Sequence, residues 1–134
     1  MNGQVVLGID IGGTNTVYGL ISKDGKVVHH ESIPTNGSLP IADLLDRLYS
    51  KVNEALSSFP EIEKIIGVGI GAPNGNHFTG MIQDPPNLSW GNVDVITLFG
   101  EIFNCKVDLT NDANAAALGE KHFGIAKDME DFVV

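Results

Sequence analysis

The segment at residues 8–15 (GIDIGGTN) groups residue types that suit the binding of a phosphate and its metal ion. Gly12 and Gly13 allow backbone N–H groups to approach an anion closely, because neither residue carries a side chain. Thr14 adds a hydroxyl donor, and the carboxylate of Asp10 is the kind of oxygen ligand that Mg²⁺ prefers. A plain hairpin turn would need the glycines but not the flanking carboxylate and hydroxyl. The segment therefore predicts a phosphate-binding turn.

A second polar cluster lies at residues 111–120 (NDANAAALGE), where a predicted strand passes into a predicted helix. Asn111 or Asp112 would cap that helix well, but capping needs one polar residue and Asn114 brings the number in this turn to three. The carboxyl ends of parallel strands are where α/β sheets usually bind ligands. A carboxylate at such an end can accept a proton from a substrate hydroxyl, which makes Asp112 a candidate general base.

Two further motifs carry weaker signals. Residues 67–72 (GVGIGA) match the looser dinucleotide-binding fingerprint, but that fingerprint needs a helix N-terminus for the pyrophosphate, and residues 73–76 (PNGN) are turn-forming. The glycines therefore indicate close packing, with Gly71 offering its backbone to a ligand. Asn87 and Trp90 combine an amide with a flat aromatic ring, which suits sugar hydroxyls and ring faces. An asparagine in a proline-rich loop is also a common turn residue.

The metal-ligating residue types do not form a zinc pattern. His29 and His30 are adjacent in a predicted strand and so face opposite sides, while His77 and His122 stand alone. Cys105 is the single cysteine, which excludes an internal disulfide and is typical of a reducing compartment.

Length and charge narrow the function classes. The 134 residues suit one domain, and 8 Lys+Arg against 17 Asp+Glu give a formal charge of −9. That field repels nucleic-acid phosphate and anionic lipid, so neither is an expected partner. The apolar runs are too short to span a bilayer, and the first residues lack the basic region of a signal peptide. A cytoplasmic protein is therefore expected.

The elements that must position these motifs follow from hydrophobic spacing. β-branched and apolar runs predict strands, and apolar residues recurring every three or four positions predict helices. Ser38 is expected to cap the first helix and Pro40 to lie in its first turn. Residues 72–86 are expected to be irregular. The predicted order is three strands, then helix, strand, helix, strand and helix, at residues 5–11, 16–22, 26–33, 41–59, 64–71, 94–103, 106–110 and 111–123.

This order predicts an α/β fold. The opening strands are joined by short turns and must run antiparallel, whereas strands separated by helices must run parallel. We expect a mixed sheet with antiparallel first three strands and helices on both faces. Residues 131–134 (DFVV) start a further apolar strand, so we expect the chain to be the first lobe of a longer protein.

Four blocks of this sequence together resemble the ROK sugar kinases, a branch of the actin-like ATPase superfamily. The blocks occur in family order, cover nearly the whole chain and are specific in combination: residues 8–15 (GIDIGGTN), 69–73 (GIGAP), 86–88 (PNL) and 109–120 (LTNDANAAALGE). The resemblance implies a ribonuclease-H-like lobe of an enzyme that phosphorylates a hexose, glucose above all, with ATP and Mg²⁺ as cofactors.

The resemblance also implies a role for each motif residue. Gly12, Gly13 and Thr14 would hold ATP phosphates, and Asp10 would act near Mg²⁺ through water. Asp112 would be the catalytic base for the sugar hydroxyl. The implied sugar contacts are Gly71, Asn87, Asn111 and Asp112. These roles suit phosphoryl transfer, which consists mostly of positioning and charge neutralisation.

The sequence departs from the family pattern in two ways. The family usually has a glycine straight after Ala-Pro, whereas this chain has Asn74 and then Gly75, which would reshape the sugar loop. The second lobe is also missing, and with it the second phosphate loop, the adenine pocket, a Glu-x-Gly-His sugar motif and a cysteine-rich zinc site. We therefore expect residues 1–134 to be an N-terminal lobe that is inactive alone, with zinc only in the absent lobe. Burial of its unpaired apolar faces by a second copy would give a homodimer.

Two alternatives to a kinase remain open. A ROK-type transcription repressor would carry a DNA-binding helical domain before the first hairpin, but here the first strand starts by Val5 and the net charge is −9. A pseudokinase or a stand-alone sugar-binding regulatory lobe is the second alternative. The presence of both Asp10 and Asp112 favours the kinase. The sequence does not indicate which hexose is the substrate.

Overall fold

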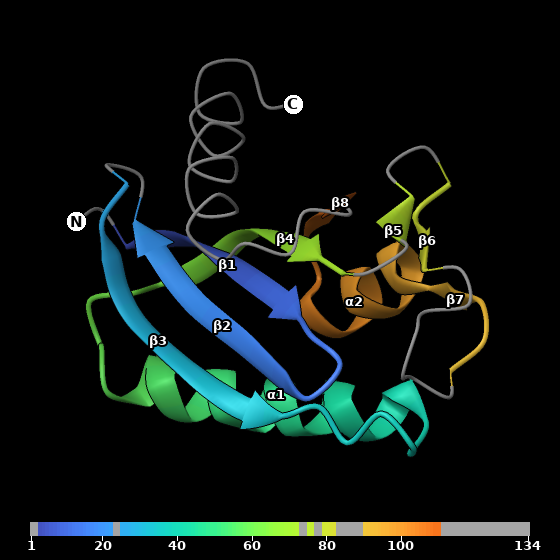
Figure 1. The fold of residues 1–134 in the computed structure, drawn as a ribbon. Coiled ribbons are helices and arrows are strands. Elements are labelled where there is room, and N and C mark those ends of the chain that lie inside the picture. Colours follow the sequence, from blue (N-terminus) through green and yellow to red (C-terminus); the bar gives the residue numbers. More distant parts are fainter. Residues whose placement is uncertain (1–2, 23–24, 73–74, 77–78, 83–89, 111–134) are drawn as a thin grey trace.

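The computed structural model of the chain describes residues 3–22, 25–72, 75–76, 79–82 and 90–110 (Figure 1). These residues form a five-stranded sheet in the order β3-β2-β1-β4-β8, a three-stranded sheet in the order β5-β6-β7, and helices α1 and α2. The bounds of the elements are β1 Gln4–Ile11, β2 Asn15–Ser22, β3 Val27–Pro34, α1 Ile41–Ser57, β4 Lys64–Gly71, β5 Gly75–Asn76, β6 Met81–Ile82, β7 Val93–Asp94, α2 Val95–Phe103 and β8 Lys106–Thr110.

The connections between strands set the strand directions. β2 runs antiparallel to both β1 and β3, whereas β1 with β4 and β4 with β8 are parallel pairs. Short turns join the antiparallel strands, and the crossovers that allow parallel pairing contain α1 and α2. Neither of these helices is long and apolar enough to cross a membrane. The predicted α/β fold, with a mixed sheet that starts antiparallel, is confirmed.

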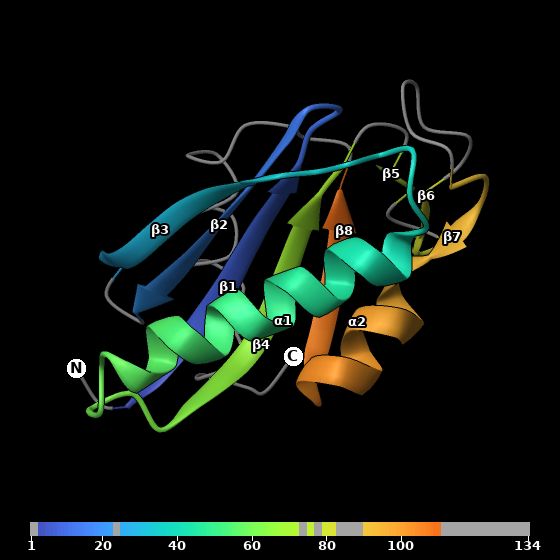
Figure 2. The same cartoon turned by 90° about the horizontal axis from the view of Figure 1, so that it is seen from below.

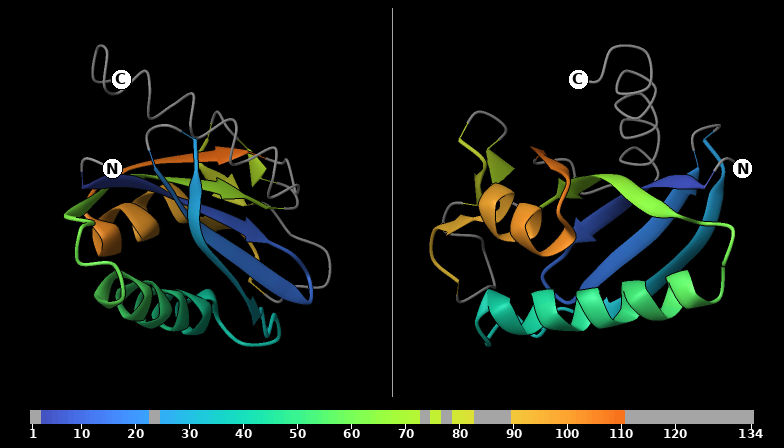
Figure 3. Two further views of the ribbon diagram at one scale, coloured as in Figure 1. Left: turned by 90° about the vertical axis from the view of Figure 1, so that its left-hand side faces the viewer. Right: turned by 180° about the vertical axis from the view of Figure 1, so that it is seen from behind.

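The hydrophobic core lies between the five-stranded sheet and the two helices. Val5, Leu7, Ile9 and Ile11 alternate along β1, are fully buried, and join one cluster with the apolar side of α1. The buried residues of α1 recur at helical spacing: Leu44, Leu45, Leu48, Val52 and Ala55. Figures 2 and 3 show α1 and α2 on the same face of the sheet. The third predicted helix, which is the one expected on the other face, lies outside the described residues.

The opposite face of the sheet has glycine at one position in each of three neighbouring strands. Gly8 in β1 lies opposite Gly19 in β2 and opposite Gly69 in β4. Because side chains alternate along a strand, Asp10 projects from the same face as Gly8. The carboxylate of Asp10 is therefore kept apart from the apolar core.

Two local predictions differ from the structure. Residues 72–86, predicted to be irregular, contribute β5 and β6 to the small sheet, where β6 also pairs with β7. Pro40, rather than Ser38, occupies the N-cap position of α1, and no side chain caps that end. The fixed φ of proline, −59° in this case, starts the helix without a hydroxyl acceptor. At α2, which begins at Val95 rather than at the predicted residue 94, Asp94 is the N-cap and its side chain accepts from the Thr97 N–H.

Candidate functional site

The glycine-rich motif forms the turn between β1 and β2. Ile11 pairs with Thr16, and beyond them the Gly12 N–H donates to the Asn15 carbonyl oxygen at 2.9 Å. A Cβ atom on Gly12 would lie 2.7 Å from that same oxygen, so no larger residue fits unless the backbone moves. Neither Gly12 nor Gly13 has a positive φ. Glycine is thus required at position 12 for close backbone approach rather than for a left-handed conformation.

Thr35, directly after β3, holds this turn by hydrogen bonds from the buried side. It is fully buried, its N–H donates to the Thr14 carbonyl oxygen at 2.9 Å, and its Oγ1 donates to the Gly12 carbonyl oxygen at 2.7 Å. The buried Thr16 Oγ1 lies 2.8 Å from Thr35 Oγ1 and forms a hydroxyl pair with it. Because the carbonyls of Gly12 and Thr14 are both held, the backbone of the exposed Gly13 between them is fixed.

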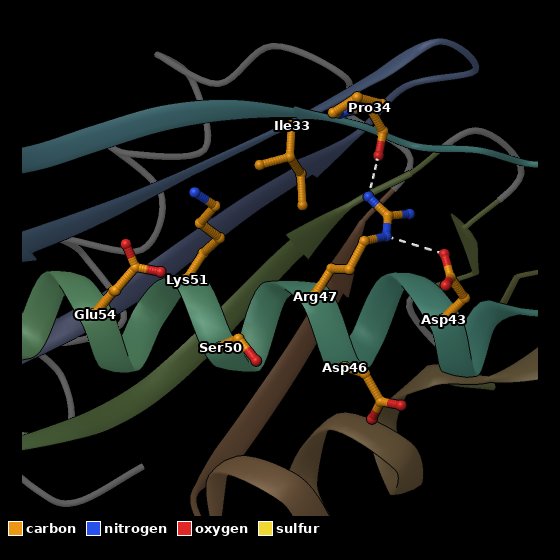
Figure 4. A pocket seen from close by; sticks show the side chains of 8 residues that line it. All are labelled: Ile33, Pro34, Asp43, Asp46, Arg47, Ser50, Lys51 and Glu54. Carbon is orange, nitrogen blue, oxygen red and sulfur yellow. Dashed lines mark hydrogen bonds and ion pairs between the residues drawn. The ribbon is translucent and has the colours of Figure 1, made fainter.

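Arg47 on α1 holds the end of β3 in the same way. Its guanidinium donates to the carbonyl oxygens of Pro34 and Thr35, the second at 2.9 Å. Its Nε donates to Asp43 Oδ2 at 2.9 Å, and Figure 4 shows Arg47 reaching from α1 toward Pro34 with Asp43 beside it. A planar guanidinium with five donors can serve several acceptors at once. A continuous chain of hydrogen bonds therefore runs from α1 through Thr35 to the turn.

Asp10 lies near the end of β1, just before the turn, and is partly buried with its Oδ1 shielded from solvent. In proteins Mg²⁺ commonly takes one or two carboxylates together with substrate phosphates and waters, rather than a cage of protein ligands. Among the described residues, no three His, Cys, Asp or Glu side chains cluster as such a cage would need. One carboxylate beside a glycine-rich turn would fit a magnesium ion that arrives with a nucleotide.

The register of the parallel strands brings separate motifs to one edge of the sheet. Asp10 on β1 lies beside Gly71 on β4, and Gly71 lies beside Thr110 on β8. Adjacent strands are about 4.8 Å apart, so these backbone positions lie within roughly 10 Å of one another. Asn111 and Asp112 follow Thr110 directly in the sequence. The edge formed by the carboxyl ends of β1, β4 and β8 is where an α/β sheet usually binds its ligand.

Part of the predicted site cannot be placed on this edge from the structure, because Asn87, Asn111 and Asp112 lie outside the described residues. Their roles stay predictions. The described part brings together the turn, Asp10 and Gly71 at one edge of the sheet.

Comparison with known proteins identifies the family. Residues 6–134 match the family model described as ROK family. The chain belongs to the ROK family. The family match and the observed fold agree with the resemblance found in the four sequence blocks.

The relatives of this ROK-family chain include both kinases and repressors. A glucokinase from Thermotoga maritima is 32% identical over 133 residues, which cover 96% of this chain and 40% of the relative. A xylose repressor from Caldicellulosiruptor bescii is 33% identical over 122 residues, which cover 89% of this chain and 30% of the repressor. A ROK family glucokinase from Streptomyces griseus, solved with glucose and AMPPNP, has a TM-score of 0.64 at 26% identity and is matched by 90% of this chain. The chain spans 37% of that protein, so it corresponds to well under half of each of these relatives.

The residues that hold the β1–β2 turn of this ROK-family chain were not singled out in the sequence analysis. Thr35 lies 23 residues from Gly12 in the sequence, and Arg47 lies 12 residues further along. The feature that could have pointed to Thr35 is Thr16. It shares the core-facing side of β2 with Tyr18 and is fully buried. A hydroxyl in such a place needs a hydrogen-bond partner, and that partner is Thr35.

Trp90 has a packing role. Its indole N–H donates to the Leu39 carbonyl oxygen at 2.9 Å, and its ring packs against the core cluster. Since Leu39 lies just before α1, Trp90 ties the segment before β7 to the start of that helix. These contacts favour a packing role for Trp90 over the predicted contact of its ring with a sugar.

A cavity of about 350 Å³ lies between β3 and α1 (Figure 4). Its cationic groups are paired with carboxylates: Arg47 with Asp43, and Lys51 with Glu31 at 3.6 Å between Nζ and Oε2. The side chains that line it are Ile33, Pro34, Asp43, Asp46, Arg47, Ser50, Lys51 and Glu54. Because these charges neutralise one another, the cavity shows no preference for an anion such as a phosphate.

Cys105 is a free cysteine in the turn between α2 and β8 and is half-buried. Burial raises the pKa of its thiol above the ordinary value, so the thiol stays protonated at neutral pH. A protonated thiol is a poor nucleophile, and Cys105 lies at the opposite end of β8 from Thr110.

Proposed function

We propose that the natural protein containing this chain phosphorylates a hexose, with glucose as the first candidate, and uses ATP with Mg²⁺. The observation that carries this proposal is the glycine turn beside Asp10, which Thr35 holds by hydrogen bonds. It lies at the sheet edge that also contains Gly71. The relatives support it, because a glucokinase matches 96% of this chain and a ROK glucokinase of similar fold binds glucose and the ATP analogue AMPPNP.

In this proposal the residues act mainly by holding the substrates in place. The N–H groups of the turn and the Thr14 hydroxyl would hold the nucleotide phosphates, and Asp10 would hold Mg²⁺ through water. The magnesium ion, when bound, neutralises charge on the phosphates. Asp112 would accept the proton of the sugar hydroxyl as that oxygen bonds to the terminal phosphorus, and ADP would leave. The sugar would be held by Gly71, Asn87 and Asn111.

A sugar-responsive regulator is the second candidate, because a xylose repressor is 33% identical to this chain over 122 residues. Such a protein would bind a sugar without phosphorylating it. The two candidates share the sugar site and differ in the use of the turn, since a kinase must bind ATP phosphates there and a regulator need not. ATP binding and turnover therefore separate them.

Steady-state assays on the natural full-length protein test the kinase proposal. We expect ATP-dependent phosphorylation of glucose, and a kcat for Asp112→Asn that is lower by roughly 10²–10⁴-fold, the usual worth of general-base catalysis. The sugar Kd should change much less, because an amide can still hydrogen-bond the hydroxyl. The melting temperature should also stay close to that of the unaltered protein, because Asn caps a helix about as well as Asp. The matched control is Asp46→Asn on the exposed side of α1, which should leave kcat unchanged.

The outcomes point in different directions. Sugar binding by the unaltered protein without any turnover would support the regulator over the kinase. Turnover that survives Asp112→Asn at full kcat would remove Asp112 from the mechanism and leave the kinase activity established.

A further inference from the structure

Thr35 uses all of its polar groups in hydrogen bonds around the turn. Its N–H donates to the Thr14 carbonyl oxygen, and its own carbonyl oxygen accepts from Arg47 Nη2 at 2.9 Å. Its Oγ1 donates to the Gly12 carbonyl oxygen at 2.7 Å and lies 2.8 Å from Thr16 Oγ1. One buried residue therefore holds the carbonyls on both sides of Gly13.

Because the peptide bond is planar, the direction of each of these carbonyl groups also fixes the direction of the N–H group of the next residue. In a trans peptide the C=O and the following N–H point in opposite directions, and no cis peptide occurs in the described part of the chain. The Gly12 and Thr14 carbonyls point at Thr35. The N–H groups of Gly13 and Asn15 must then point away from Thr35, in a stretch of exposed residues.

We propose that Thr35 is a positioning residue for the nucleotide phosphates. By fixing the carbonyls of Gly12 and Thr14, it fixes the N–H groups of Gly13 and Asn15 in the direction from which a phosphate oxygen is bound. The inference rests on the proposed kinase function. Donors that are oriented before the ligand arrives need no reorganisation on binding, so a site of this kind binds more tightly than a mobile loop with the same residues.

Arg47 extends this arrangement to the helix layer. Its two donations to the carbonyls of Pro34 and Thr35 fix the chain where it leaves β3, and Asp43 orients the guanidinium from one turn earlier in α1 (Figure 4). Arg47 is only partly buried, and its bonds to this segment end on backbone atoms. The position of the turn is therefore set by α1 through the backbone of Thr35.

Contacts other than those of the Thr35 hydroxyl also hold the hairpin. The β1–β2 ladder continues to the Ile11 and Thr16 pair, and Ile9 and Ile11 are fully buried in the core. Valine has nearly the shape of threonine, so Thr35→Val removes the hydroxyl and keeps the volume. A purely structural Thr35 would change stability alone, whereas a positioning residue changes nucleotide affinity in the folded protein.

The experiment compares Thr35→Val, Thr35→Ser and a control, Thr97→Val, in the natural full-length protein. Thr97 Oγ1 donates to Asp94 Oδ2 at the start of α2, so the control removes one hydrogen-bonded hydroxyl from a different part of the molecule. We expect Thr35→Val to raise the KM for ATP about tenfold, as the loss of a buried hydrogen bond implies, with little change in the sugar KM. Thr35→Ser, which keeps the hydroxyl, should restore the KM for ATP, and Thr97→Val should not change it.

Hydrogen exchange of the amides in residues 12–16, measured without nucleotide, gives a readout that does not need activity. The exchange should be faster in Thr35→Val than in Thr35→Ser. Arg47→Met should also speed the exchange and raise the KM for ATP, but less than Thr35→Val does. If Thr35→Val fails to fold, Arg47→Met provides the test. A KM for ATP and an exchange rate equal to those of the unaltered protein in both variants would overturn the proposal. Absence of turnover in the unaltered protein would instead count against the kinase function, with the exchange result still deciding whether Thr35 orders the turn.

Discussion

The β1–β2 and β2–β3 turns both contain glycine and use it differently. In the β1–β2 turn, Gly12 has no left-handed conformation, but a Cβ there would lie 2.7 Å from the Asn15 carbonyl oxygen. In the β2–β3 turn, Gly25 has a φ of +86°, and its N–H donates to the Ser22 carbonyl oxygen at 3.0 Å. Glycine supplies space in the first turn and a backbone conformation in the second.

The two turns also differ in what holds them. In the β2–β3 turn, the Ser22 N–H and Oγ both donate to the Lys26 carbonyl oxygen, at 2.9 and 3.2 Å. The β1–β2 turn is held by Thr35 and, through it, by Arg47 on a helix. The described residues of the β2–β3 turn bond to one another, whereas the β1–β2 turn is held by residues distant in the sequence.

The largest effect is expected from Gly12→Ala. The added methyl group meets backbone rather than a flexible side chain, so the turn must shift by some tenths of an ångström or more. A displacement of that order in a site that works by positioning can lower kcat/KM by roughly 10²-fold. The kcat/KM for ATP of the natural full-length protein measures the effect, and circular dichroism shows whether the sheet is retained.

The comparison predicts that Gly12→Ala damages function more than stability. Near-normal kcat/KM for ATP in this variant would contradict a need for space at position 12, because the turn would then tolerate the shift. Gly13→Ala is the matched control, since it adds a methyl group to the same turn at an exposed residue with no positive φ. It should lower kcat/KM for ATP less than Gly12→Ala does.

A moderate effect on stability alone is expected from Gly25→Ala. An L-residue in the left-handed region costs about 1–2 kcal/mol, so the free energy of unfolding should fall by about that amount while kcat/KM for ATP stays unchanged. Gly25→Asn should cost less, because asparagine tolerates this conformation better. Urea unfolding measures the difference. A kinetic defect in Gly25→Ala as large as that of Gly12→Ala would break the distinction between the two turns.

The smallest effect on stability at neutral pH is expected from Tyr18→Phe. Tyr18 lies on β2 between the two turns. Burial, with added contributions from the charge and hydrogen bond of Glu31, raises the pKa of Tyr18 from 10.0 to about 12. The folded state thus holds the phenol proton more tightly than the unfolded state. This stabilisation is complete below the unfolded pKa, so the free energy of unfolding should fall as the pH rises from about 10 to about 12.

Unfolding by denaturant at several alkaline pH values tests this expectation. Tyr18→Phe should remove part of the alkaline fall in stability, whereas Tyr49→Phe, at a more exposed tyrosine, should not. An identical pH dependence in Tyr18→Phe and the unaltered protein would show that Tyr18 is not the group responsible.

Much of the fold could be predicted because its signals are local. The strands predicted at residues 64–71 and 106–110 have the observed bounds of β4 and β8, and α1 ends within a few residues of its predicted end. The short strands β5, β6 and β7 were not predicted, because each has two residues and is too short to show a period. The predicted start of α1 at residue 41 is the observed one, but its cap was misassigned: Ser38 has the chemistry of a cap, whereas Pro40 occupies the N-cap position.

The amino-acid sequence by itself determined the types and order of the longer described elements and the resemblance to the ROK family, while phosphate binding by residues 8–15 stays a prediction from residue type. These depend on residue type and on neighbours a few positions away. Only the tertiary structure decided that Gly12 is needed for space, that Asp10 lies beside Gly71, and that Thr35 holds the turn. Such contacts join residues far apart in the chain, and their partners are selected by packing and strand register, which no local pattern of residue types encodes.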